Sequence, residues 1–169
     1  MTVSKRFVQT AVLASMLMTQ LAHSQSVTKA FVPEEVFAGR SEGKGEMRLV
    51  LSRKRPFTVA SRGTMQGDGR FRLEQDVQFE GEAVQTRSWV MWQTSPGHYS
   101  ATLTDATGLA VGRTEGSRLT LRYPLNRWGL VMHQTLDLAK DERTVVNSGS
   151  IRLLGIPIGT VQETIRLRR

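Results

Sequence analysis

The chain has 169 residues, of which 39% are hydrophobic, 7% aromatic and 22% charged, and its formal net charge is +8. This composition is too apolar for a disordered chain and is sufficient for one globular core. The sequence contains no cysteine, which excludes disulfide bonds, a thiolate nucleophile and a cysteine-ligated metal site.

The first segment of the chain has the three-part pattern of a secretory signal. Lys5 and Arg6 precede a largely apolar stretch at 7–21, and Ala22-His23-Ser24 then places small residues at the −3 and −1 positions of a cleavage site. This order is typical of Sec-type export signals. The apolar stretch is shorter than the ~20 residues that a membrane-spanning helix needs, and no cysteine follows it to carry a lipid.

We therefore predict a signal peptide at 1–24 and a single mature domain at 25–169, located in the periplasm or secreted. A retained membrane anchor is the alternative interpretation. Location argues against nucleic acid as a partner, because an exported protein does not meet it.

The mature domain begins with a short helical signal and continues with strand patterns. Pro33-Glu34-Glu35-Val36-Phe37 predicts one helical turn, since proline suits the first helical position. Apolar and polar residues then alternate, most clearly over 71–79, 119–125 and 161–167. A period of two puts successive side chains on opposite faces of a strand. With turn signals between such runs, the pattern predicts about ten strands.

The number and spacing of the strands favour a closed sheet. Short connections place strands that are neighbours in sequence side by side. About ten strands with one apolar face would leave two vulnerable edges unless the sheet closed. We predict an all-β fold, a single antiparallel lipocalin-like or calycin-like β-barrel, with space for side chains and one small apolar ligand. A β-sandwich is the alternative.

Short motifs follow one another in a characteristic order along the mature chain. They are Phe37-x-Gly39, Arg87-x-Trp89, Gly97-x-Tyr99, Asp105-x-x-Gly108, Ala110-x-Gly112, Tyr123, Asp141-x-Arg143-Thr144-x-x-Asn147 and Gly155-x-x-x-Gly159. Over about residues 33–169 the chain thereby resembles the bacterial domain-of-unknown-function family 3833. The resemblance implies a calycin-like barrel in an exported protein, often a lipoprotein, without an established activity. Members are often encoded near enzymes that modify membrane fatty acids, which implies a role with lipids.

The chain departs from the family pattern in two places. The segment Gln134-Thr135-Leu136-Asp137-Leu138 stands where members usually have an acidic pair and an aromatic residue, and Ser148 stands where an arginine is usual. If the acidic pair carried the function of the family, this chain lacks it. The missing lipoprotein cysteine is typical of a soluble periplasmic member.

Residues with catalytic or metal-binding chemistry are few. Beyond the signal segment the histidines are His98 and His133, and no spacing is typical of a zinc site or of a Gly-x-Ser-x-Gly nucleophile. We predict no metal, no cofactor and no catalytic residue. An enzyme that gathers Asp105, His133 and Glu163 in space is the alternative.

Charged residues on apolar strand faces are the most informative candidates for a site. Arg87 shares a face with Trp89 and Met91, and Glu163 shares one with the apolar residues of 161–167. A buried isolated charge costs several kcal/mol. We predict that Arg87 and Glu163 point into the barrel, with Arg87 stacked on an aromatic ring, where they meet each other or the polar head of a ligand. With Tyr123, these form the candidate interior site: Arg87, Trp89, Met91, Tyr123 and Glu163. A strand bulge or a purely structural ion pair is the alternative.

Two surface features complete the candidates. Arg53, Lys54 and Arg55 could bind an anionic lipid headgroup or an acidic partner, although arginine is also an ordinary solvent-facing residue. Trp128 lies in the loop 126–129 at the predicted barrel mouth. It is expected either to fold back over the barrel end, which we favour, or to touch a membrane surface or cap the cavity.

Three functions remain open. The sequence favours an exported envelope protein that binds a fatty acid, another lipid or a similar small apolar ligand inside its barrel. The first alternative is an envelope interaction protein that works through its basic surface, with an anionic membrane surface as a possible partner. The second is an envelope hydrolase.

Overall fold

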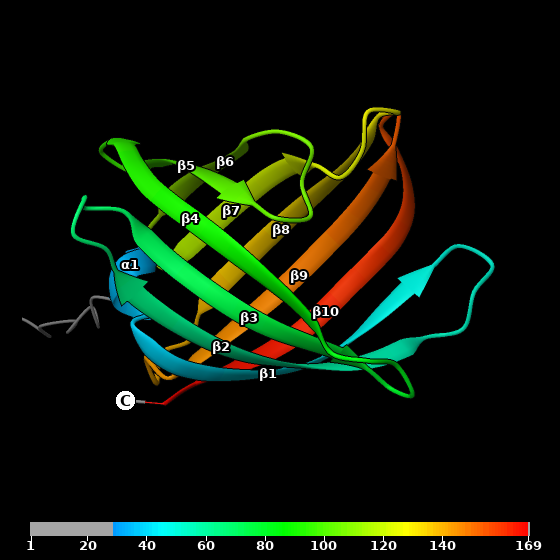
Figure 1. The fold of residues 1–169 in the computed structure, drawn as a ribbon, viewed down its shortest axis with the longest axis horizontal. Coiled ribbons are helices and arrows are strands. Elements are labelled where there is room, and N and C mark those ends of the chain that lie inside the picture. Colours follow the sequence, from blue (N-terminus) through cyan, green and yellow to red (C-terminus); the bar gives the residue numbers. More distant parts are fainter. Residues whose placement is uncertain (1–28, 169) are drawn as a thin grey trace, which may run out of the picture.

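The computed structural model describes residues 29–168, which form one closed barrel preceded by a short helix (Figure 1). The predicted signal peptide at 1–24 lies outside the described residues. The elements are α1 (Pro33–Val36), β1 (Gly39–Leu49), β2 (Arg55–Met65), β3 (Phe71–Phe79), β4 (Gln85–Ser95), β5 (His98–Leu103), β6 (Ala110–Glu115), β7 (Arg118–Pro124), β8 (Leu130–Leu138), β9 (Thr144–Leu153) and β10 (Ile156–Arg168).

The strands follow one another around the barrel in chain order. Each pairs antiparallel with the next, and β10 pairs with β1, from Arg40 opposite Arg168 to Leu49 opposite Gly159. This closure removes both sheet edges. The predicted antiparallel barrel of about ten strands is confirmed, and so is the helical turn, which has proline at its start. The sandwich alternative is excluded.

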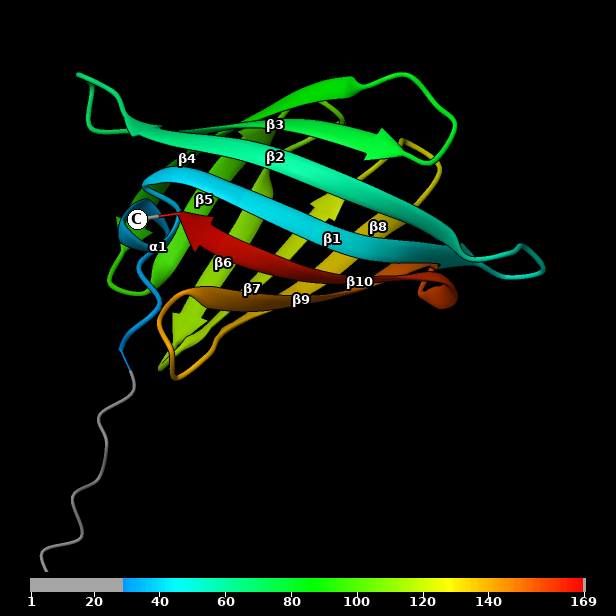
Figure 2. The ribbon, with the colours of Figure 1, turned by 90° about the horizontal axis from the view of Figure 1, so that it is seen from below.

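The antiparallel order sorts the loops between two ends of the barrel (Figure 2). Helix α1 and the β2–β3, β4–β5, β6–β7 and β8–β9 loops lie at one end, which we call the closed end. The β1–β2, β3–β4, β5–β6, β7–β8 and β9–β10 loops lie at the other, which we call the open end.

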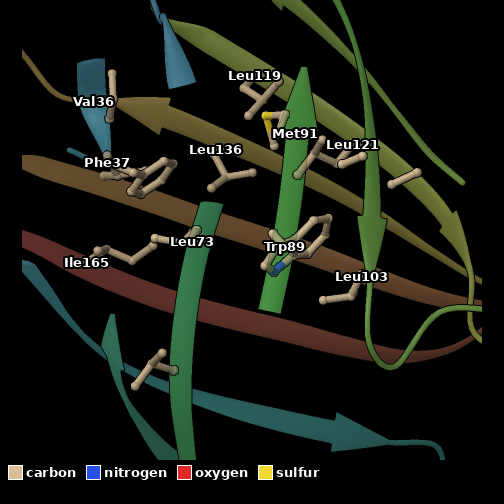
Figure 3. Packing of buried hydrophobic residues seen from close by; sticks show 14 of the residues in the cluster. Val36, Phe37, Leu73, Trp89, Met91, Leu103, Leu119, Leu121, Leu136 and Ile165 are labelled. Carbon is tan, nitrogen blue, oxygen red and sulfur yellow. The ribbon is translucent and has the colours of Figure 1, made fainter. Parts of the chain in front are cut away.

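The segment around α1 seals the closed end. Phe31, Val36 and Phe37 are buried, and the rings of Phe31 and Phe37 lie 5.9 Å apart. The Phe31 amide donates a hydrogen bond to the Gly116 carbonyl at 2.8 Å, which fixes the segment to the β6–β7 loop. A Cβ on Gly63 would overlap the Phe37 carbonyl oxygen, so glycine is needed in β2 for this close approach. Figure 3 shows Phe37 directed into the core, beside Leu73 and Leu136.

Candidate functional site

The open-end half of the barrel is hollow. A cavity of about 340 Å³ lies between the strands there. Its walls are mainly apolar. The apolar residues come from six strands and the β7–β8 loop: Met47, Phe57, Val77, Phe79, Leu125, Met132, Ile151 and Val161. The size falls within the ~300–1,000 Å³ range of small-molecule pockets.

The closed-end half of the barrel is packed. Only about 50 Å³ of free space remains there, and large apolar side chains surround it: Phe37, Phe71, Leu73, Trp89, Met91, Leu119, Leu121, Leu136 and Ile165 (Figure 3). Four side chains line both this space and the larger cavity, namely Arg87, Gln134, Asn147 and Glu163. Together with Gln75 they form a polar layer across the middle of the barrel, which we call the polar belt.

One half of the polar belt is organised by Gln75. Its Oε1 accepts hydrogen bonds from Arg87 Nε at 2.9 Å and from Trp89 Nε1 at 3.0 Å. Its Nε2 donates to Ser61 Oγ at 3.3 Å. The amide therefore holds the arginine and the tryptophan in fixed positions, because each of its ends has a partner.

The other half is a chain of hydrogen bonds that ends on a carboxylate. Tyr123 Oη donates to Gln134 Oε1 at 3.0 Å, and Gln134 Nε2 donates to Asn147 Oδ1 at 3.4 Å. Asn147 Nδ2 in turn donates to Glu163 Oε2 at 2.9 Å. Burial raises the pKa of Tyr123 to about 12, so its hydroxyl remains a donor at ordinary pH.

Glu163 carries a buried carboxyl group, which fits beside β1 because residue 43 is glycine. A Cβ on Gly43 of the neighbouring strand would overlap Glu163 Oε1, so this side chain occupies the space above Gly43. Burial raises the pKa of Glu163, and the hydrogen bond from Asn147 and the charge of Arg87 partly offset that rise. Glu163 therefore keeps its proton to a higher pH than an exposed glutamate.

Arg87 lines the inner end of the cavity. Its Nε donates a hydrogen bond to Gln75. Its Nη1 lies 3.8 Å from Asp105 Oδ2 in the β5–β6 loop, and the two form a long, partly exposed ion pair. The predicted stacking of Arg87 on a ring is wrong for the described residues: the cation–π contacts there belong to Arg55 and Arg70. The reason is that Trp89 packs edge-on against Tyr123, 5.2 Å between centroids, and turns its indole NH to Gln75.

The structure therefore divides the predicted interior residues into two groups. Arg87, Tyr123 and Glu163 line the open-end cavity, whereas Trp89 and Met91 border the small space in the packed half and do not reach that cavity. Within the described chain Arg87 and Glu163 form no direct ion pair, because Gln75 binds the arginine and Asn147 binds the glutamate.

Three polar residues of the belt were not predicted as site residues. Gln75 interrupts the apolar face of 71–79 and Asn147 ends a family motif, and these signals could have indicated them. Gln134 lies in the segment that departs from the family pattern. Its inward direction could be read only from the alternation of its strand, in which Met132 and Leu136 are buried on either side.

The basic cluster of the β1–β2 loop is largely neutralised. Lys54 forms a salt bridge with Glu46, and Arg55 forms one with Glu82 while its guanidinium lies 4.4 Å from the centroid of the Phe79 ring. In the described part of the chain Arg53 has no carboxylate partner.

The three residues of the enzyme alternative do not all converge. Asp105, in the β5–β6 loop, and Glu163, inside the barrel, both line the open-end cavity, but His133 does not. His133 lies between the inward residues Met132 and Gln134 and thus faces outward, where burial and the charges of Arg152 and Arg122 lower its pKa. Among residues 29–168, no group of three or more His, Asp or Glu side chains could hold a metal ion.

Comparison with known proteins identifies the family. The model of a family described as "protein of unknown function (DUF3833)" matches residues 10–167. The chain belongs to the DUF3833 family. No curated protein matches this DUF3833 sequence. Within residues 29–168, no helix has the length and apolar character needed to cross a membrane.

Solved structures share the fold of this DUF3833 protein. The S-type phycobiliprotein lyase CpeS from Guillardia theta has a TM-score of 0.65 at 7% identity, over 80% of this chain and 90% of that one. A DUF3598-family protein of unknown function from Nostoc punctiforme has a TM-score of 0.61 at 12% identity, over 87% of this chain and 53% of that one. At such identities the likeness shows the fold alone, and it confirms the lipocalin-like barrel class.

Proposed function

We propose that this DUF3833 protein binds a small amphipathic ligand with one acyl chain, of the fatty-acid class, in the open-end cavity. The observation that carries this proposal is the cavity of about 340 Å³ whose apolar walls end on Arg87 and Glu163. The ligand's chain contacts the walls, and its polar head meets the polar belt. The likeness to the phycobiliprotein lyase barrel supports a small-ligand role for this shape.

The apolar walls supply the affinity. Burying a methylene group is worth about 0.8 kcal/mol, so a chain of several methylenes gains enough to offset its loss of freedom. The cavity is near the lower end of the range for small-molecule sites, which favours a single chain over a diacyl lipid.

The polar belt supplies the head-group preference. Gln75 takes only the Nε of Arg87, so Nη2 is left for a ligand, and Nη1 has only the long, partly exposed ion pair with Asp105 at 3.8 Å, which a ligand carboxylate would replace. A guanidinium binds a carboxylate through two parallel hydrogen bonds, and this pairing offsets the cost of burying the anion. A protonated Glu163 would add a donor rather than a repelling charge, consistent with its raised pKa.

We also propose that the protein is exported to the cell envelope. The segment 1–24 supports this by its basic start, apolar centre and small residues before Gln25. Intact mass and N-terminal sequencing of the protein from a periplasmic fraction test it. A mature chain that starts at or near Gln25 is expected, and an uncleaved chain in the cytoplasm would contradict it.

Native mass spectrometry with dodecanoate and palmitate tests the ligand. We expect a one-to-one adduct with the natural sequence and at least about tenfold weaker binding for Arg87→Met, because the head group loses its ionic partner. Val161→Phe fills the cavity and should abolish the adduct, whereas Thr160→Phe, on the outer face of the same strand, should retain it.

Two results would refute the proposed ligand site. One is the absence of any adduct at an excess of both fatty acids. The other is an adduct that survives Val161→Phe unchanged, since the ligand would then lie elsewhere.

A further inference from the structure

The exposed apolar side chains of this protein gather around the mouth of the barrel. Twelve large hydrophobic residues are exposed in the described chain, and nine of them lie at the open end. We call these nine the apolar rim: Leu49, Val50, Leu51, Val84, Leu109, Trp128, Leu153, Leu154 and Ile156. Soluble surfaces rarely concentrate apolar groups in this way unless they meet a partner.

Three of the rim loops form one connected edge. The Leu154 amide donates to the Gly129 carbonyl at 3.0 Å, which joins the β9–β10 loop to the β7–β8 loop. The Val50 amide donates to the Ile158 carbonyl at 2.8 Å, which joins the β1–β2 loop to the start of β10. In Figure 2 the β1–β2 and β9–β10 loops project together from the open end.

Two tips of this edge hold leucine where backbone geometry disfavours it. Leu51 has φ 64° and is 103% exposed, and Leu154 has φ 49° and is 79% exposed. The left-handed region favours glycine or asparagine, and leucine gains no burial in the chain to compensate. A leucine at each tip is thus explained by contact with something outside the chain.

Trp128 adds to the same edge. The prediction that it folds back over the barrel is wrong, because it is 81% exposed. The Asn126 side-chain oxygen accepts hydrogen bonds from the Trp128 amide at 3.0 Å and the Leu130 amide at 2.9 Å. These bonds fold the loop backbone around Asn126 and leave the indole outside.

Unpaired cations accompany the apolar rim. Arg48, Arg53 and Arg127 are exposed at the open end, and within residues 29–168 none of them has a salt-bridge partner. The carboxylates Glu46, Glu82 and Asp105 at this end are already paired with Lys54, Arg55 and Arg87. Glu80 of the β3–β4 loop also lies at this end, without a salt-bridge partner among residues 29–168. Three unpaired arginines thus stand against this one unpaired glutamate, and the charge left on the rim is mainly positive.

We propose that the apolar rim docks the open end on an anionic lipid bilayer. Leu51, Trp128 and Leu154 enter the headgroup boundary, and the three arginines meet lipid phosphates. Exposed apolar side chains next to arginines suit this boundary. The tryptophan ring can pack against acyl chains while its NH faces water, and the arginines are attracted to the anionic lipids. Docking goes beyond ligand binding and does not depend on it, but it places the cavity mouth against a source of acyl chains.

Vesicle co-sedimentation of the chain as isolated from cells, with its N-terminus fixed by intact mass, tests this docking. The rim variant combines Leu51→Asn, Leu154→Asn and Trp128→Ser. Asparagine accepts the left-handed conformation, so both leucine changes should preserve the fold. The control combines Met65→Ser and Val146→Ser, two exposed apolar residues away from the rim, with exposed fractions of 57% and 42%.

We expect the natural protein to bind phosphatidylglycerol-containing vesicles more tightly than pure phosphatidylcholine vesicles, and added salt to weaken binding. The rim variant should lose at least about tenfold in affinity, because three apolar insertions are removed, and the control should match the natural protein. Equal binding by the rim variant, or no binding of the natural protein to anionic vesicles, would overturn the proposal.

Further measurements distinguish membrane docking from ligand binding and from self-association through the apolar rim. Val161→Phe should still bind vesicles, and the rim variant should still form the fatty-acid adduct, so either proposal can fail alone. Sedimentation equilibrium without lipid should show a monomer. A dimer that the rim variant disrupts would make a second copy the occupant and overturn the membrane assignment.

Discussion

The two ends of the barrel are built on different principles. At the closed end, α1 and its flanking phenylalanines cover the core. Five of the eight salt bridges in the described chain lie there, and its exposed large hydrophobic residues among residues 29–168 are Met65 and Val146. At the open end, nine such residues surround a hollow. The closed end stabilises the fold, and the open end is free for contact.

One loop at each end shows the same contrast locally. In the β8–β9 loop of the closed end, Asp141 Oδ1 accepts hydrogen bonds from the Arg143 and Thr144 amides, each at 2.9 Å. These bonds and the one from the Thr144 hydroxyl, the strongest influence, lower the pKa of Asp141. Both loops hold one non-glycine residue in the left-handed region, Glu142 with φ 52° and Leu154 with φ 49°. The closed-end loop has the Asp141 side chain to fix its backbone, whereas the only side-chain hydrogen bond to the β9–β10 loop in the described chain is the 3.4 Å bond from Arg152 Nη1 to the Gly155 carbonyl.

A matched pair of substitutions gives the largest expected effect. Phe37 in the closed end and Phe57 in the cavity wall are equally buried, at 7% and 8% exposure. Phe37→Ala should lower the free energy of unfolding by about 4 kcal/mol, because it empties a packed site. Phe57→Ala should cost about 2 kcal/mol, because its ring already borders free space and has fewer partners to lose.

Urea unfolding of the two variants measures this difference. Similar losses for both would mean that the open half is as tightly packed as the closed half. The contrast between the two ends would then disappear from the energetics.

A smaller effect concerns the pH dependence of stability at the polar belt. Burial raises the folded-state pKa of Glu163 above its ordinary value of 4.5. The contribution of Glu163 to the free energy of unfolding is therefore fully present below pH 4.5, and this contribution is lost as pH rises through the folded-state pKa. Glu163→Gln should therefore flatten this fall and raise the free energy of unfolding at neutral pH relative to the natural protein.

Glu42, an exposed glutamate whose pKa is shifted in the opposite direction, is the control. The hydrogen bond and charge of Arg168 lower the pKa of Glu42, so its contribution is present above the ordinary value and lost on acidification. Glu42→Gln should thus slightly lower stability at neutral pH. Urea unfolding from about pH 3 to about pH 8 covers the range in which the two changes are expected, and parallel profiles for the two variants would contradict the buried environment of Glu163.

The alternation of apolar and polar residues made most of the fold predictable from the sequence. A period of two identified the strands, and the need to remove edges predicted closure. The same parity placed Arg87 and Glu163 on inward faces. The partners of these residues were beyond the sequence, because Gln75 and Asn147 come from other strands and reach them only through the barrel register.

Which half of the barrel is hollow could not be predicted either. Apolar residues line both halves, and the difference arises because α1 fills one end while no segment of the described chain fills the other. The exposure of Trp128 depended on the hydrogen bonds of Asn126, a detail of loop geometry. Such long-range packing and loop features leave no periodic signal in a sequence.

A titration with palmitate followed by NMR tests the central claim most directly. The side-chain amides of Gln134 and Asn147 and the indole NH of Trp89 report on the polar belt, and the Trp128 indole reports on the mouth. We predict saturable shifts of the Gln134 and Asn147 amides at one equivalent, with the methyl signals of Leu119 in the packed half unchanged. Shifts confined to the outer wall, or none at all, would contradict a ligand site inside the open half of the barrel.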